Sequence, residues 1–223
     1  MTEAVLFDFN GVLVDDEAQH CEALQAVLRD DAITMSREQY YADYLGLDDR
    51  TGFVQAFRRA NRTLTTEILN RLVAAKSRRY LALVTKSLRL VPGATEFVRD
   101  AGRRYRLGIV SGAVRREIDI VLRKSGLGDR FEIVIAADDV RHCKPDPAGY
   151  LAAQAAFTKR RAVAANACVA IEDSLPGLEA ARAAGMACVM LTTNYPGSTF
   201  GGRGPALVWD SFSGHTAAEL ADL

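Results

Sequence analysis

The chain has 223 residues, and its 28 lysines and arginines balance 28 aspartates and glutamates, so the net charge is zero with neutral histidines. This balance excludes a general electrostatic attraction to nucleic acid or to an anionic membrane surface. With 49% apolar residues, no run near the ~18 needed to span a bilayer and no secretion signal at the N-terminus, the sequence favours a cytoplasmic globular protein.

Short apolar runs alternate with longer helical patterns along most of the chain. Runs this apolar are typical of strands buried on both faces, as in a parallel sheet covered by helices. The alternation predicts an α/β fold whose core is a Rossmann-like, doubly wound, mostly parallel sheet. The expected strands are Ala4–Phe7, Leu107–Val110, Ile133–Ala137, Cys168–Ile171, Cys188–Leu191 and Ala206–Trp209.

One long stretch interrupts this alternation. Residues 16–87 contain amphipathic helical patterns but no convincing strand, and Asp16 and Ser36 each precede a glutamine by three residues, as in a capping box. We therefore predict an inserted, four-helix-like α-helical cap domain over residues 16–87. The catalytic core would consist of residues 1–15 and 88–223, with hinges where the chain crosses between the two.

Cap residues mark two helices in the second half of the chain. Asp146 followed by Pro147 predicts a helix with an aspartate N-cap and a proline at its first position. Ser174 predicts the N-cap of another helix, and Gly185 predicts the end of that helix.

Polar residues follow four of the expected strands, near the edge where ligands of an open parallel sheet bind. Asp8 follows the first strand, Ser111 the second and Glu172-Asp173 the fourth, while Lys144 lies shortly beyond the third. Two sets of carboxylates, a hydroxyl group and a lysine at one edge indicate phosphoryl transfer.

Carboxylates at this edge predict a metal ion. A phosphate dianion repels a carboxylate nucleophile, so a divalent cation must lie between them. Asp8 and Asp173, with Glu172, offer the hard oxygen ligands that Mg²⁺ prefers. Asp8 is the predicted nucleophile, which attacks phosphorus to form an aspartyl-phosphate.

The remaining polar groups of this edge suit a phosphate. Lys144 can contact both the Asp8 carboxylate and the phosphate as a compact positive charge. Ser111 and the backbone N–H of Gly112 can donate hydrogen bonds to the non-bridging phosphate oxygens.

In order and spacing, these segments resemble the four motifs of the haloacid dehalogenase-like (HAD) superfamily. The resemblance extends over nearly the whole chain and is greatest to the branch that holds β-phosphoglucomutase and phosphoglycolate phosphatase-like proteins. It implies a C1-type helical cap after the first motif. The matching segments are Asp8-Phe-Asn-Gly-Val-Leu, Val110-Ser-Gly, Lys144-Pro-Asp-Pro, and Ile171-Glu-Asp-Ser with the glycine- and alanine-rich stretch from Gly177 to Gly185.

One position departs from the family pattern. Phosphatases and mutases of the family carry a second aspartate two residues after the nucleophile, as general acid and base, whereas this chain has Asn10. The backbone carbonyl of Asn10 can still bind Mg²⁺, but its amide cannot deliver a proton, a contribution typically worth ~10²–10⁴ in rate. Three explanations stay open: His20, Asp15 or Asp16 moves the proton; the enzyme is slow or limited to good leaving groups; or the chain is an engineered trap or a binding relative.

The resemblance also implies substrate-binding residues. Arg50 matches a cap-loop arginine, Lys76 a cap lysine and His20 a histidine that follows the hinge in mutase-like relatives. Arg115 follows the second motif, where relatives often contact substrate. A solvated or structural helix residue is the alternative for each.

The expected function is that of a Mg²⁺-dependent phosphatase for a small phosphorylated metabolite, most naturally a sugar phosphate. The alternatives are a β-phosphoglucomutase-like sugar-phosphate mutase and a low-turnover protein that binds phosphorylated metabolites. No long heptad or apolar stripe is present, so we expect a monomer that binds neither nucleic acid nor membrane.

Overall fold

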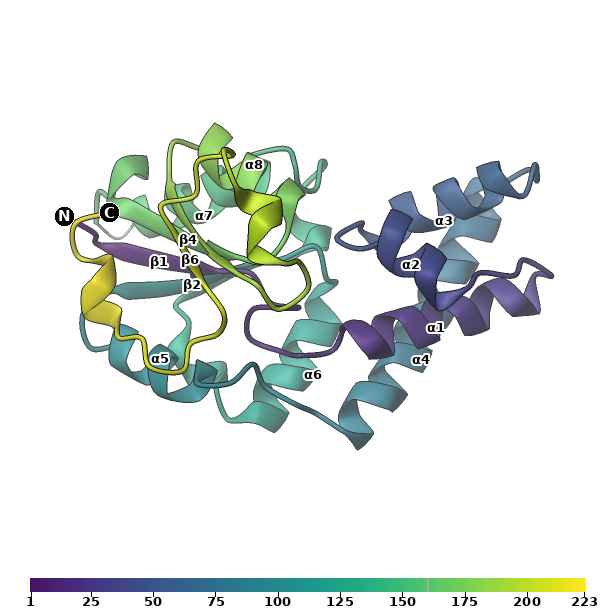
Figure 1. Cartoon of the computed structure of the whole chain (residues 1–223), viewed down its shortest axis with the longest axis horizontal. Helices are drawn as coiled ribbons and strands as arrows, with labels where there is room; N and C mark the ends of the chain where they lie inside the picture. Colours follow the sequence, from purple (N-terminus) through teal and green to yellow (C-terminus); the bar gives the residue numbers. More distant parts are fainter. Residues whose placement is uncertain (160) are drawn as a thin grey trace. The chain divides into compact units, whose positions relative to one another are not determined.

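The computed structural model describes residues 1–159 and 161–223 and contains a parallel β-sheet (Figure 1). Among the described residues the sheet has six strands, in the order β3-β2-β1-β4-β5-β6, and every neighbouring pair is parallel. The predicted α/β fold with a doubly wound parallel sheet is therefore confirmed. The strands are β1 (Ala4–Phe7), β2 (Arg106–Val110), β3 (Ile133–Ile135), β4 (Cys168–Glu172), β5 (Ala187–Leu191) and β6 (Leu207–Trp209).

Strand β1 lies in the middle of the sheet, between β2 and β4. All four of its residues are fully buried, because helices cover both faces of a sheet of this kind. Figure 1 shows α5 and α6 on one face and α7 and α8 on the other. These helices are α5 (Ala94–Ala101), α6 (Arg115–Ser125), α7 (Ala148–Thr158) and α8 (Leu175–Ala183).

One predicted end each of β2, β4, β5 and β6 differs from the observed end by one residue. Two further predictions in this part of the chain are wrong. Strand β3 ends at Ile135, and residues Ala137–Asp139 form a 3-10 helix. The neighbouring strand β2 has already ended at this level, so the N–H of Ala137 donates to the carbonyl of Ala113 in the loop after β2. The N-cap of α7 is Pro147 and not Asp146. The Asp146 carboxylate instead accepts from the N–H of Ala148 at 2.8 Å.

The chain divides into two compact units. The sheet unit comprises Met1–Asp15 and Leu88–Leu223, and the helical unit comprises Asp16–Ser87. The helical unit contains α1 (Glu17–Asp30), α2 (Arg37–Asp43), α3 (Asp49–Arg59) and α4 (Thr66–Lys86). Among the described residues, no helix combines the length and apolar composition that crossing a membrane requires.

The helical unit has a hydrophobic core of its own. Cys21, Leu24 and Leu28, spaced along one face of α1, are buried there with Phe53 and Leu72. Because each helix of the unit buries an apolar face against the others, the unit needs no strand for its stability.

Two capping boxes were expected in the helical unit, and one is present. Ser36 accepts from the N–H of Gln39, whose side chain accepts from the N–H of Ser36. The capping box predicted at Asp16 is wrong, because the carboxylate makes no cap hydrogen bond. It accepts instead from the hydroxyl of Tyr80 at 2.5 Å, and it is 1% exposed.

Candidate active site

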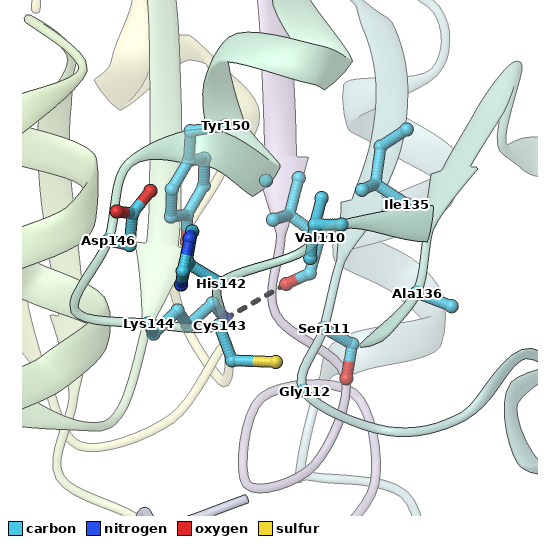
Figure 2. Close-up of a pocket in the computed structure, with 12 residues that line it drawn as sticks. Val110, Ser111, Gly112, Ile135, Ala136, His142, Cys143, Lys144, Asp146 and Tyr150 are labelled. Atoms are coloured by element: carbon cyan, nitrogen blue, oxygen red, sulfur yellow. Dashed lines mark hydrogen bonds between the residues drawn. The ribbon is translucent and has the colours of Figure 1, made fainter. Parts of the chain in front are cut away.

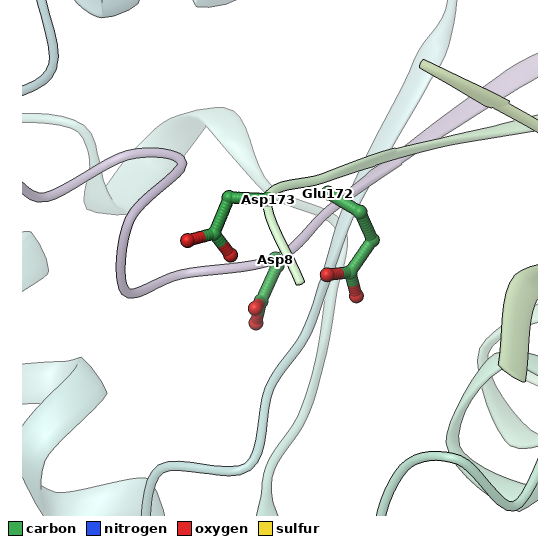
Figure 3. Close-up of side chains that lie close together, drawn as sticks. All are labelled: Asp8, Glu172 and Asp173. Carbon is green, nitrogen blue, oxygen red and sulfur yellow. The ribbon is translucent and has the colours of Figure 1, made fainter. Parts of the chain in front are cut away.

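The carboxyl ends of β1 and β4 bring three acidic residues together (Figure 3). Asp8 follows β1, Glu172 is the last residue of β4 and Asp173 follows it. One carboxylate oxygen from each lies within 4.8 Å of the others, and all three side chains are nearly inaccessible to solvent. The sheet therefore gathers residues that are about 165 positions apart in the chain, as parallel strands that end at one edge do.

Lys144 supplies positive charge to this cluster. Its ammonium group lies 2.9 Å from Asp8 Oδ1 and 2.5 Å from Glu172 Oε1, and it donates to the carbonyl of Val110 at 2.9 Å. Burial lowers the pKa of Lys144, but the two carboxylates outweigh burial and hold its pKa above the ordinary value. Lys144 therefore stays protonated, and its three contacts fix its position.

Glu172 is fully buried and held on both carboxylate oxygens. The hydroxyl of Tyr150 donates to Oε1 at 2.6 Å, and the hydroxyl of Ser174 donates to Oε2 at 3.2 Å. Ser174 also accepts from the N–H of Gly177, which confirms it as the N-cap of α8. A Cβ atom at Gly177 would lie 1.9 Å from the Glu172 carboxylate, so this turn of α8 requires glycine.

The charge balance at the cluster suits a divalent cation. Burial, the main influence, and the nearby Glu172 carboxylate raise the pKa of Asp8, while Lys144 lowers it, with a net result of about 6. Three carboxylates facing one ammonium group leave an excess of negative charge when all are ionised. Hard oxygen atoms at this spacing are the ligands that Mg²⁺ takes, so the residues present fit that ion.

The segment that follows β2 lies at the same edge of the sheet. Ser111 and Gly112 follow β2 and line a small pocket together with Lys144 (Figure 2). The Ser111 hydroxyl accepts from the N–H of Ala113 at 3.0 Å, which leaves its own proton available to donate. Cys143 also lines this pocket. Sequence reasoning missed it, although it directly precedes the motif lysine.

The loop after β1 contains Asn10 and Gly11. Gly11 has a φ of +72° and donates its N–H to the carbonyl of Val14 at 2.7 Å. A Cβ atom at Gly11 would lie 2.1 Å from Asp173 Oδ2, so the loop can approach Asp173 only through a glycine. Asn10 lies in this loop, two residues beyond Asp8.

Asn194, which follows β5, was not predicted. Its amide Nδ2 donates to Asp173 Oδ2 at 2.7 Å. Its position just after a strand of the parallel sheet is the same signal that pointed to Asp8, Ser111 and Asp173. Asn194 could therefore have been found by following every strand to its carboxyl end.

Comparison with known proteins assigns the chain to a family. Residues 2–185 match the model of the haloacid dehalogenase-like hydrolases. The chain belongs to this family. The resemblance predicted from the motifs is thereby confirmed.

Relatives of this HAD-like hydrolase include proteins named as phosphatases. The phosphorylated carbohydrates phosphatase of Thermotoga maritima is 29% identical over 184 residues, which cover 82% of each chain. The hexitol phosphatase B of Escherichia coli is 29% identical over 191 residues, which cover 84% of this chain and 82% of the relative.

Solved structures share the fold. CbbY from Rhodobacter sphaeroides, crystallised as an aspartate-to-asparagine variant with xylulose-1,5-bisphosphate, is 26% identical, with a TM-score of 0.84 over 96% of both chains. The β-phosphoglucomutase of Clostridium difficile is 22% identical, with a TM-score of 0.85 over 100% of this chain and 96% of that one. This last likeness concerns the fold alone.

The HAD-like hydrolase carries two of the predicted substrate-binding residues side by side in its helical unit. The Lys76 ammonium lies 2.6 Å from His20 Nδ1 and 2.5 Å from Asp49 Oδ1, and the His20 ring stacks on Tyr80 with centroids 4.1 Å apart. Burial and Lys76 lower the pKa of His20, but the carboxylates of Asp16 and Glu17 outweigh them. The pKa of His20 therefore lies above its ordinary value.

The two predicted arginines make other contacts. Arg50, in the first turn of α3, donates to Asn70 at 2.6 Å on an exposed surface. Arg115, the first residue of α6, donates to the carbonyl of Val134 and to the carboxylate of Asp139, each at 2.5 Å. These bonds attach the start of α6 to β3 and to the 3-10 helix after it, which is the structural role considered as the alternative for Arg115.

Proposed function

We propose that this HAD-like hydrolase is a Mg²⁺-dependent phosphatase that hydrolyses small phosphate monoesters, with sugar phosphates as the substrate class. The observation that carries the proposal is the buried Asp8 carboxylate, paired with the Lys144 ammonium at 2.9 Å and adjacent to Glu172 and Asp173. The sugar-phosphate class is supported by the Thermotoga maritima relative, which is named a phosphorylated carbohydrates phosphatase.

The metal would be held by Asp8, Asp173 and the backbone carbonyl of Asn10. Both oxygens of Glu172 already accept hydrogen bonds from protein groups, so Glu172 contributes mainly negative charge and the position of Lys144. When bound, Mg²⁺ neutralises the repulsion between the Asp8 carboxylate and the phosphate dianion.

In the proposed reaction Asp8 Oδ attacks phosphorus while the ester P–O bond breaks. The leaving alkoxide takes a proton, and the phosphoryl group remains on Asp8 as an aspartyl-phosphate. Water then attacks the phosphorus, loses a proton and regenerates the Asp8 carboxylate with release of inorganic phosphate. Lys144, the Ser111 hydroxyl and the N–H of Gly112 stabilise the charge on the phosphoryl oxygens through both steps.

The proton for the leaving oxygen does not come from Asn10, because an amide is not an acid at neutral pH. Of the three groups considered, Asp16 accepts from Tyr80 and Asp15 forms an exposed ion pair with Arg89 at 3.7 Å. We propose His20, whose pKa lies above its ordinary value, as the proton-transfer group, in a helical unit that acts as a cap. His20, Lys76 and Arg50 would then contact the substrate.

The test is phosphate release from a panel of sugar phosphates and small phosphoesters, with Mg²⁺ and with EDTA. The phosphatase proposal expects release that requires Mg²⁺, is abolished in Asp8→Ala and persists in Asp119→Ala, which removes an exposed aspartate of α6 on the same unit. His20→Gln should lower release at neutral pH, and the difference should shrink at alkaline pH, where the imidazole of the unaltered chain is itself deprotonated.

Three outcomes would contradict the proposal. Release that persists in Asp8→Ala would remove Asp8 as the nucleophile. No release from any compound, together with interconversion of sugar phosphate isomers, would favour the mutase; no conversion but ligand-dependent stabilisation would favour the binding protein.

A further inference from the structure

Asn194 occupies the turn that follows strand β5, on the sheet unit. The turn is anchored where the N–H of Thr192 donates to the carbonyl of Trp209 at 2.9 Å. From this turn the Asn194 side chain reaches Asp173, with Nδ2 at 2.7 Å from Oδ2. The bond joins the ends of two neighbouring strands, β5 and β4.

The chemistry of the two groups sets the direction of this hydrogen bond. An ionised carboxylate only accepts, and an amide donates only through nitrogen. The Asn194 amide must therefore turn its nitrogen toward Asp173, and one carboxylate oxygen of Asp173 is held at a defined position.

Gly11 closes the other side of this pair. A Cβ atom at Gly11 would lie 2.1 Å from Asp173 Oδ2 and 2.6 Å from Asn194 Nδ2. The backbone of the loop that follows the nucleophile strand therefore packs directly on the Asp173–Asn194 hydrogen bond. The ends of β1, β4 and β5 meet at this contact, so the orientation of Asp173 is tied to both neighbouring loops.

The two acidic residues at the end of β4 are thus held in different ways. Glu172 is bound by Tyr150, Ser174 and Lys144, whereas an asparagine 21 residues further along the chain binds Asp173. A neutral donor fixes the geometry of a carboxylate and leaves its negative charge available to a cation.

We propose that Asn194 is a positioning residue that orients Asp173 for Mg²⁺ binding. This inference rests on the Mg²⁺ site of the proposed function and adds a residue to it. Hydrogen bonds from residues behind metal ligands typically contribute 10- to 100-fold in metal affinity. Loss of the Asn194 amide should therefore weaken Mg²⁺ binding by about 10- to 100-fold, with little effect on the metal-free fold.

The experiment is isothermal titration of Mg²⁺ into the full chain and into Asn194→Ala, Asn194→Leu and Thr192→Ala. Asn194→Leu fills a similar volume without a donor, and Thr192→Ala removes a hydroxyl of the same turn that donates to Asp210 on the surface. Both Asn194 variants should bind Mg²⁺ about 10- to 100-fold more weakly, and Thr192→Ala should match the unaltered chain. The Tm of each variant in EDTA, and the activity at increasing Mg²⁺, are measured alongside.

Each outcome decides the proposal. Unchanged affinity in either Asn194 variant would overturn it, as would a fall in the EDTA Tm large enough to unfold the protein. Activity that recovers at high Mg²⁺ would support it, because a purely structural defect does not respond to the metal. If the unaltered chain bound no Mg²⁺, the proposed metal site itself would be contradicted. If the unaltered chain and both Asn194 variants bound Mg²⁺ equally well, the metal site would stand and only the role of Asn194 would be contradicted.

Discussion

At the scale of single residues, the buried carboxyl group of Asp8 resists ionisation in the metal-free site. Its pKa of about 6, against 3.8 for an ordinary aspartate, results from burial, which raises it most, from Lys144, which lowers it, and from the Glu172 carboxylate, which raises it. A difference of one pH unit in pKa corresponds to about 1.4 kcal/mol, so keeping Asp8 ionised costs the metal-free fold about 3 kcal/mol. The site thus favours either a proton or a cation at Asp8.

This cost predicts a pH dependence of stability. Because the pKa of Asp8 is raised in the folded state, its contribution to stability is fully present below pH 4 and is lost as the pH rises through 6. In EDTA at pH 8, Asp8→Asn should therefore unfold with a higher free energy than the unaltered chain, by up to about 3 kcal/mol. The difference should shrink between pH 6 and pH 4.

Urea denaturation of both proteins at several pH values measures this difference. Asp146→Asn, which removes a carboxylate from an exposed turn of the same unit, is the control. A pH-independent difference between Asp8→Asn and the unaltered chain would contradict the origin assigned to the raised pKa.

Asn10 is the residue at which the chain departs from the family pattern, and restoring the aspartate there has a predicted effect. Asn10→Asp should raise the turnover number for phosphate release by about 10²–10⁴ if general acid catalysis is missing at this position. Asn166→Asp, which changes an exposed asparagine before β4 in the same way, should have no effect. Steady-state kinetics with one sugar phosphate measure both. An unchanged turnover number in Asn10→Asp would mean that another group already supplies the proton.

At the scale of elements, the first turn of α8 and the end of β4 are held together by hydrogen bonds and close packing. Ser174 caps the helix and donates to Glu172, and the helix approaches that carboxylate through Gly177. The buried glutamate is therefore positioned by a helix start as well as by a strand end. A change in this turn should affect both the fold and the position of Lys144, which binds Glu172.

Gly177→Ala tests this coupling. The added methyl group would overlap the Glu172 carboxylate, at 1.9 Å, and overpacking of this kind typically costs about 1–3 kcal/mol. We expect a lower Tm and reduced activity. Gly128→Ala, where an added Cβ meets only ordinary contacts at 3.9 Å, is the matched control. Equal Tm values for the two variants would show that α8 can move away from β4 without cost.

At the scale of the whole molecule, the helical unit and the sheet unit each bury a separate hydrophobic cluster. The carboxylates and the lysine of the candidate metal site all lie in the sheet unit. Damage to the core of the helical unit should therefore leave metal binding intact while it lowers the stability of that unit.

Phe53→Ala is the corresponding prediction. Phe53 is fully buried in the helical unit, and its truncation should destabilise that unit by about 3–5 kcal/mol. Amide hydrogen exchange should increase in Asp16–Ser87, whereas Mg²⁺ affinity should stay unchanged. Val54→Ala, at a neighbouring exposed position, should alter neither. A loss of Mg²⁺ affinity in Phe53→Ala would mean that the sheet unit depends on the helical unit for its fold.

The fold was largely predictable because its signals are local. Apolar runs marked every strand, and β1 was predicted with both ends correct, since a fully buried central strand is apolar along its whole length. Boundaries failed where a tertiary contact replaced the local one. The same holds for a predicted capping bond: Asp16 is the N-cap residue of α1, but its buried carboxylate accepts from the hydroxyl of Tyr80 and makes no cap hydrogen bond.

The sequence by itself determined the family, the parallel sheet and the residues at its carboxyl edge. Apolar strands and short motifs can be recognised from residues that are close together in the sequence. Only the tertiary structure decided how those residues are held. Tyr150 on Glu172 and Asn194 on Asp173 are contacts between elements 21 or 22 residues apart. No local pattern encodes such pairs, because they depend on which loops the sheet brings together and on how closely a glycine lets them approach.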